Sequence, residues 1–195
     1  MNIFFLDPDP EVCAKEHLDK HVVKMIIEYA QLMSTAHRIL DGEPTTEKVN
    51  GRNLKRWKLP DDRENLLYKA SHYNHPSAVW VRKSQKNYAW LFSMWRHLLK
   101  EYTFRYGKIH SSERLLFALS KAPKNISNEP WTQPTPAMPF ECKVVNGYQV
   151  DSMLSYRNYY IQKKAYFAKW TKREVPAWFA KGIAFFEMAK SIQND

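Results

Sequence analysis

Apolar positions recur at helical spacing along most of the chain. The clearest stripe consists of seven large apolar residues: Tyr88, Leu91, Phe92, Trp95, Leu98, Leu99 and Tyr102. This i, i+3, i+4, i+7 spacing is typical of an amphipathic helix. Asn74-His75-Pro76 precedes the stripe as a helix start, and Gly107 follows it as a stop. The pattern therefore predicts a long central helix from about 76 to 107.

A second long helix is predicted at the start of the chain. Asp9 is a suitable N-cap, Pro10 suits the first helical position, and Asp41-Gly42 ends the apolar pattern after Leu40. The other predicted segments follow in chain order: a polar loop over 43–60, a short helix over 61–70, a helix over 111–121, an irregular proline-rich segment over 123–139, a hairpin over 144–150, a basic helix from 151 and a last helix from 176.

These elements indicate an all-α fold. The chain has 195 residues, which suits one domain, and its sequence contains neither an internal repeat nor a linker. We expect a single-domain helical bundle around the long central helix, with a short irregular or hairpin insertion. Within 1–195 we expect a helical core over 1–107, an extension with the basic aromatic helix over 108–175, and a C-terminal helix over 176–195.

The first long helix carries a narrow polar stripe. Six polar residues fall within roughly 80° of its circumference: His17, His21, Lys24, Glu28, Gln31 and Thr35. The other faces are largely apolar, so the helix should be buried, and the stripe either pairs with buried groups or lines a cleft. A plain intrahelical ion pair of Lys24 with Glu28 is the simplest alternative. Because no His-Glu-x-x-His motif or acidic cluster completes a metal site, we expect no metal and no other cofactor.

The charge of the chain points to a polyanionic partner. The formal net charge is +10, which favours nucleic acid first and an anionic membrane second. The segment 152–173 contains six basic residues and no acidic ones, with aromatic residues interleaved. A solvated helix face is the alternative, but this composition suits contacts with a nucleic-acid backbone and its bases. The residues expected to contact the DNA backbone are Arg157, Lys163, Lys164 and Lys169.

Composition also limits the compartment and the chemistry. With 44% hydrophobic and 26% charged residues the chain should fold. Asp7 interrupts the first apolar run, no segment approaches the length of a membrane span, and the two cysteines are expected to be reduced. We therefore expect a cytoplasmic protein without a membrane partner, in a bacterial host if the chain is encoded by a virus. The sequence has no P-loop or Rossmann motif, which argues against phosphoryl transfer on ATP.

The run from 17 to 31 resembles the catalytic helix of the pyrimidine dimer DNA glycosylase family, the phage endonuclease V type. Members of that family have an Asp-x-His sequence followed by a catalytic Glu nine residues after the Asp, and Asp19, His21 and Glu28 have this spacing. The segments 1–8 and 74–80, and more weakly 176–179, are also similar to parts of family members. The resemblance covers about 1–107 and 176–183.

The resemblance implies a mechanism in which the α-amino group at the chain terminus attacks C1′ of a deoxyribose. The base then leaves, and an imine allows β-elimination of the strand. Glu28 would stabilise cationic intermediates and move protons. His21 would lie beside it and either orient it or act as an acid. Met1 would supply the amine, because an α-amino group is a weaker base than a lysine and is more often neutral. Lys24 is the competing amine.

The expected cleft lies between the chain start, the polar stripe and the turn at 74–76, where aromatic residues would hold a flipped base. The residues expected to bind substrate are His17, Gln31, Asn74, His75, Trp80 and Arg82. The phage enzyme has arginines where Ile27 and Gln31 stand. Phosphate contacts are therefore expected to move to Lys24, Arg82 or the C-terminal basic segment.

The leading functional hypothesis is a DNA glycosylase, with or without abasic-site lyase activity, that acts on damaged or modified pyrimidines in double-stranded DNA. No obligatory protein partner is expected. Two alternatives stay open. One is an enzyme of the same fold that cleaves an N-glycosidic bond in a free or signalling nucleotide. The other is a non-catalytic nucleic-acid-binding protein in which Glu28 forms a buried structural ion pair.

Overall fold

The computed structural model describes residues 1–194, and the side chains of all of these except 190, 193 and 194. The helices are α1 (Pro10–Glu16), α2 (Asp19–Asp41), α3 (Arg63–Leu66), α4 (Pro76–Lys83), α5 (Gln85–Tyr106), α6 (Leu116–Leu119), α7 (Ser152–Lys163) and α8 (Ala177–Asn194). The strands are β1 (Glu43–Val49), β2 (Arg52–Lys58), β3 (Val144–Asn146) and β4 (Gln149–Asp151). Short 3-10 helices cover Ser111–Leu115, Phe140–Cys142 and Ala165–Phe167.

The expectation of an all-α fold is wrong. The chain is mostly helical, at 55%, but its described residues also form two antiparallel sheets of two strands each, β1 with β2 and β3 with β4. The hairpin predicted over 144–150 is present as β3 and β4, with Asn146 opposite Gln149 next to the turn. The segment 43–60, which we expected to be a loop, contains β1 and β2 instead.

The hairpin of β1 and β2 has a turn signal but no alternating apolar pattern. Asn50 and Gly51 both have positive φ, 47° and 76°, as a two-residue type I′ turn requires. Most side chains of the two strands are exposed, so burial does not impose the period of two by which a strand is recognised. Trp57 of β2 packs edge to face on Tyr73, with ring centroids 5.0 Å apart. This contact holds the hairpin against the loop before α4.

Each of the two predicted long helices is divided in two by a capping residue. His17 has an extended backbone and separates α1 from α2. Ser84 separates α4 from α5, and its hydroxyl accepts a hydrogen bond from the backbone N–H of Asn87. Apolar residues are buried on both sides of each break, so the hydrophobic periodicity continues through it and gives no sign of the interruption.

The last predicted helix is present as α8, whereas the remaining predicted helices are short. Only α3 lies within 61–70, the segment 111–121 is a 3-10 turn followed by α6, and the basic helix ends at Lys163. The chain then returns to the start of α2, where the N–H of Asp19 donates to the carbonyl of Lys169 at 2.8 Å. The basic residues of 152–173 therefore do not share one helical face.

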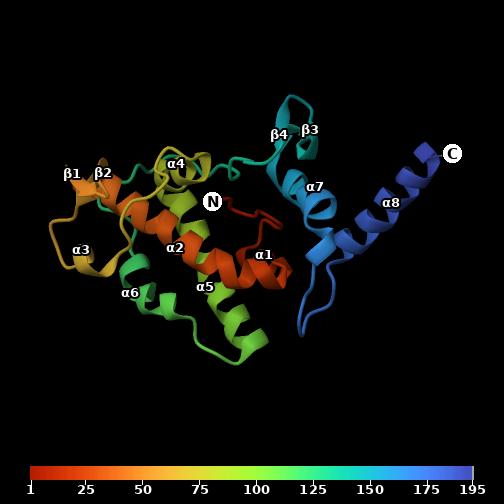
Figure 1. Ribbon diagram of the computed structural model, residues 1–195, viewed down its shortest axis with the longest axis horizontal. Coiled ribbons are helices and arrows are strands. Elements are labelled where there is room, and N and C mark those ends of the chain that lie inside the picture. Colours follow the sequence, from red (N-terminus) through yellow and green to blue (C-terminus); the bar gives the residue numbers. More distant parts are fainter. Residues whose placement is uncertain (195) are drawn as a thin grey trace.

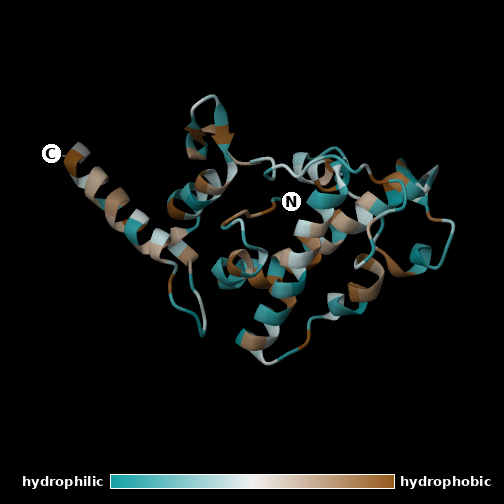
Figure 2. Cartoon of the chain, turned by 180° about the vertical axis from the view of Figure 1, so that it is seen from behind, coloured by the Kyte–Doolittle hydropathy of each residue, from teal (hydrophilic) through white to brown (hydrophobic). Residues whose placement is uncertain are grey.

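The helices α2 and α5 cross near the centre of the molecule, and α1 and α4 pack against them (Figure 1). Residues 3–6 have no regular secondary structure, yet their side chains are almost completely buried. Figure 2 shows this hydrophobic start of the chain in the middle of the molecule. Phe4 packs there on two rings of α7, Tyr156 and Tyr160. The buried segment brings Met1 to the polar face of α2.

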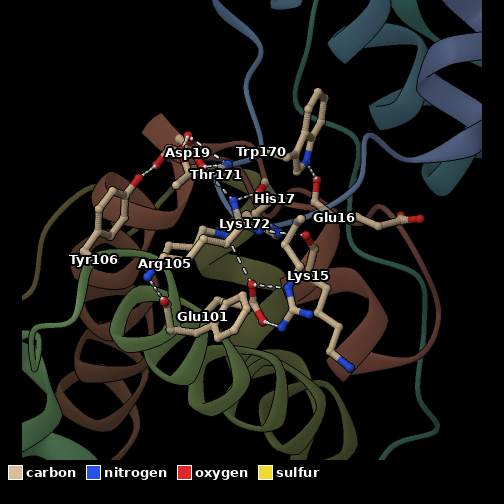
Figure 3. A network of polar contacts seen from close by, with 12 residues as sticks. Lys15, Glu16, His17, Asp19, Glu101, Arg105, Tyr106, Trp170, Thr171 and Lys172 are labelled. Carbon is tan, nitrogen blue, oxygen red and sulfur yellow. Dashed lines mark hydrogen bonds and ion pairs between the residues drawn. The ribbon is translucent and has the colours of Figure 1, made fainter.

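A buried polar network joins α5 to the junction of α1 and α2 (Figure 3). The guanidinium of Arg105 donates to the carbonyls of Lys15 and His17, at 2.8 Å each, and to Asp19 at 3.0 Å. Glu101, one turn earlier on α5, accepts from Arg105 at 3.2 Å. Because Arg105 is only 3% exposed, this single side chain satisfies polar groups that water does not reach, and it fixes where α2 begins.

Replacing Arg105 by Met is expected to destabilise the fold by about 3–5 kcal/mol. The reason is that Asp19 and two backbone carbonyls then lose their hydrogen-bond donor inside the fold. For a chain of this size that corresponds to a fall in Tm of about 6–20 °C. Arg96→Met is the matched control on the exposed side of α5, and a change within about 0.5 kcal/mol is expected there. Equal denaturation midpoints for the two variants would show that the network does not stabilise the fold.

Candidate functional site

The start of the chain and α2 together form the candidate site. The α-amino nitrogen of Met1 lies 3.7 Å from Oε2 of Glu28, and Nζ of Lys24 lies 3.3 Å from Oε1 of the same carboxylate. The side chain of Glu28 is 16% exposed and that of Lys24 is 69% exposed. Glu28 is therefore a mostly buried carboxylate between two amines, and it is not sealed from solvent.

A chain of hydrogen bonds holds the first residues in place. Nδ1 of His17 lies 2.7 Å from the carbonyl of Cys13 and must donate to it, so Nε2 accepts from the hydroxyl of Tyr29 at 2.8 Å. The oxygen of Tyr29 in turn accepts from the backbone N–H of Phe4 at 3.2 Å. His17, predicted to bind substrate, is fully buried and positions the backbone three residues from the Met1 amine.

The buried histidines make the fold sensitive to acid. Burial lowers the pKa of His17 and His37 to about 4 and that of His21 to about 2. Between the ordinary histidine pKa near 6.5 and these values, the unfolded chain binds protons that the native chain does not. The contribution of these histidines to the free energy of unfolding is therefore fully present above about pH 6.5. Below that pH it is expected to fall by about 1.4 kcal/mol per pH unit for each histidine. Denaturant titrations at several pH values measure this slope, and a flat profile between pH 7 and 5 would contradict it.

His21 is paired with α7 and not with Glu28. Its ring stacks on Phe4 with centroids 4.1 Å apart, and its Nδ1 lies 2.6 Å from the hydroxyl of Tyr160. Burial lowers its pKa most, followed by the charges of His17, Lys164 and Lys24. The ring is therefore neutral over most of the pH range, and its contacts with Tyr160 and Phe4 lie away from Glu28.

The turn before α4 lies beside the Met1 amine. His75 is the N-cap of α4, and its Nδ1 accepts the backbone N–H of Ser77 at 3.2 Å, which leaves its ring proton on Nε2. Burial lowers the pKa of His75, the Met1 amine and His72 lower it further, and Glu28 raises it. His75 therefore interacts electrostatically with both members of the amine and carboxylate pair, as the sequence-based hypothesis of a common cleft requires.

Arg82 supports the same turn. Its Nη1 donates to the carbonyl of Tyr73 at 2.6 Å, and burial lowers its pKa. Asn74, between these residues, is exposed, and Gln31 is half-buried one turn beyond Glu28. Of these residues only Gln31 lies on the helix that carries Glu28. Within the part of the chain that the structure describes, none of them forms a hydrogen bond or ion pair with Glu28 or Met1.

Trp80 is part of the core. It is buried, and its indole N–H donates to the carbonyl of Thr132 at 3.0 Å, so its ring does not offer the open face that a flipped base needs. Five cavities within the described residues are lined by other segments, the largest beside Arg96, Thr103 and Ile109. None of these five cavities is lined by Met1, Lys24 or Glu28, so the predicted cleft is not among them, and the 16% exposure of the Glu28 side chain is the access to solvent that the structure shows.

The residues predicted to contact DNA differ in whether their side chains already pair with other groups of the protein. Nε of Arg157 donates to the carbonyl of Leu6 at 2.7 Å, and its Nη2 pairs with Asp7 at 3.3 Å. Arg157 thus anchors the end of the buried start of the chain. Lys163 pairs with Glu141 at 3.1 Å, whereas Lys169 is exposed.

Sequence analysis missed one cation that the structure brings near the site. Lys20 is exposed one turn before Lys24 on α2, and its Nζ lies 4.6 Å from the ring centroid of Phe167. Lys164 lies over Tyr159 at 4.8 Å and near the same Phe167 ring. The i, i+4 spacing of Lys20 and Lys24 was available in the sequence, but the approach of Lys164 to them depends on the chain reversal after α7.

Within the described residues no group of three or more His, Cys, Asp or Glu side chains is placed to hold a metal ion. None of the helices over 1–194 has both the length and the apolarity needed to cross a membrane. Comparisons with protein-family models, curated proteins and solved structures found no match for the chain.

Proposed function

We propose that the protein is a DNA glycosylase with abasic-site lyase activity that acts on damaged or modified pyrimidines. The observation that carries the proposal is the 3.7 Å approach of the Met1 amine to Glu28. The two groups come from segments far apart in the sequence, and a buried stretch of chain holds one against the other. A nucleophilic amine beside a carboxylate is the pair that imine chemistry at a sugar carbon needs.

In the proposed reaction the amine nitrogen of Met1 forms a bond to C1′, and the bond from C1′ to the base breaks. One proton of the amine leaves with the base, and the other goes to the ring oxygen O4′ as the sugar ring opens and an imine forms between the nitrogen and C1′. Glu28 stabilises the positive charge on that nitrogen and accepts or returns protons. Removal of a proton from C2′ then breaks the C3′–O bond, which cleaves the strand. The net positive charge of the chain attracts the DNA.

The number of ionisable groups around Glu28 argues against a purely structural role for this carboxylate. A structural ion pair needs only Lys24, whereas the carboxylate also faces the Met1 amine and interacts with His75. Three ionisable groups around one mostly buried carboxylate are typical of a reactive site. This arrangement supports an enzyme over a non-catalytic binding protein.

The test is a screen of duplexes that each carry one damaged or modified pyrimidine. We expect release of the base from at least one duplex, a cleaved strand, and a covalent protein–DNA adduct after borohydride reduction. If no base is released from any duplex by the intact chain, the proposal fails, and hydrolysis of free nucleotides should be assayed next.

A further inference from the structure

One charged surface of the molecule is not explained by the site itself. We call it the lysine-aromatic face, and it consists of Lys20, Lys24, Tyr159, Lys164, Tyr166 and Phe167. The ring of Phe167 lies between the ammonium groups of Lys20 and Lys164, with its centroid 4.6 Å from one and 5.9 Å from the other. Within the described residues, no carboxylate lies within 4.0 Å of either ammonium group. Their charges are therefore available to an anion.

The face is continuous with the candidate site. Lys24 belongs to both, because its Nζ contacts Glu28. Lys20 lies two turns before Glu28 on α2, about 12 Å away at 1.5 Å per residue. Each nucleotide of a duplex strand rises about 3.4 Å along the helix axis, so this distance corresponds to a few nucleotides at most. A strand whose reacting sugar lies at Glu28 would thus place its neighbouring phosphates beside these lysines.

The aromatic part of the face suggests what else is recognised. Tyr166 is 86% exposed and packs edge to face on Phe167, with ring centroids 4.7 Å apart. A large exposed ring that packs on another ring, which is itself in contact with two lysines, is suited to stack on a base that has no neighbour on one side. An enzyme that extrudes a nucleotide from the helix creates such unstacked bases.

We propose that the lysine-aromatic face binds an unpaired stretch of the DNA strand that carries the reacting nucleotide. Lys20 and Lys164 contact its phosphates, and Tyr166 stacks on a base beside the extruded one. The inference rests on the proposed function for the choice of DNA as the partner. It adds the path of the strand and a preference for locally unpaired DNA.

The lysines are tested by the salt dependence of binding to undamaged DNA, in which no base is released. Fluorescence anisotropy is measured with a single strand, a paired duplex, and the same duplex with a central bubble. For the single strand, the double variant Lys20→Ala/Lys164→Ala should lower the slope of log affinity against log salt by about 1.4, at about 0.7 per lost contact. The control Lys69→Ala/Lys83→Ala removes the same charge from lysines that pair with glutamates. An equal change in both double variants would overturn the proposal.

The stacking residue is tested with the same three DNAs. Tyr166→Ala should weaken binding to the single strand and the bubble by about 5- to 150-fold, whereas Tyr166→Phe should keep it and the paired duplex should change little. Equal losses on all three DNAs would overturn the stacking role. Because these measurements need no catalysis, a chain that binds through this face but releases no base contradicts the proposed function alone.

Discussion

Acetylating the α-amino group of Met1 is expected to abolish both strand cleavage and borohydride trapping on a damaged duplex. Imine formation needs a free, unprotonated amine, and an acetyl amide does not supply one. The Met1 amine is placed for this chemistry because residues 3–6 are buried and its nitrogen lies 3.7 Å from Glu28. The measurement is a denaturing gel of trapped adducts and cleaved strands, with an intact mass that confirms Met1 as the first residue and its modification.

Lys24→Ala is the matched control for the amine. Lys24 contacts the same carboxylate but is 69% exposed, so its removal should leave the buried start of the chain in place and trapping measurable. Loss of trapping in Lys24→Ala, with trapping intact after acetylation, would make Lys24 the nucleophile. Base release that survives both changes without any adduct would mean that Glu28 activates water, as in a glycosylase without lyase activity.

Glu28→Gln is expected to lower the rate of base release by about 100- to 10,000-fold, the usual contribution of a positioned acid or base. The amide keeps the size of the side chain but neither stabilises an iminium charge nor accepts a proton. The single-turnover rate of base release on the best duplex measures the loss. Affinity for undamaged DNA should stay the same or rise, because one negative charge is removed near the strand.

Glu11→Gln is the matched control for Glu28. Glu11 pairs with a lysine four residues away, as Glu28 does, at 2.6 Å on α1, but it is not part of the site. An unchanged rate is expected for this control. If Glu28→Gln releases base as fast as the intact chain, the carboxylate has only a structural role and the reaction must use other groups.

The local signals of the sequence were sufficient for most of the helical elements. Helical periodicity and capping residues such as Asp9 are properties of short segments, so they can be read without the fold, and Asp9 caps α1 as expected. The β1 and β2 hairpin was missed because its strands face solvent and have no apolar alternation. Its position depends on tertiary contacts: Arg38 of α2 donates to the carbonyl of Trp57 at 3.0 Å and to that of Tyr68 at 2.6 Å.

The polar stripe shows what spacing alone can determine. It indicated that Lys24 and Glu28 share a face of one helix, and the structure confirms their contact at 3.3 Å. It could not show that the helix breaks after His17, because the break is fixed by Arg105 from α5, far away in sequence. His17 consequently does not share the site of the other stripe residues. Thr35, two turns beyond Glu28 on the same helix, accepts from the N–H of Ser71 at 3.2 Å.

By itself the sequence determined that Glu28 lies on the polar face of a mostly buried helix and that the chain is strongly basic. Only the tertiary structure decided which groups from other segments of the chain meet Glu28. The burial of residues 3–6 brings the Met1 amine to it, and the chain reversal after α7 brings Lys164 close to Lys20. The physical reason is that spacing along a helix fixes neighbours within one element, whereas neighbours from different elements depend on which apolar surfaces pack together.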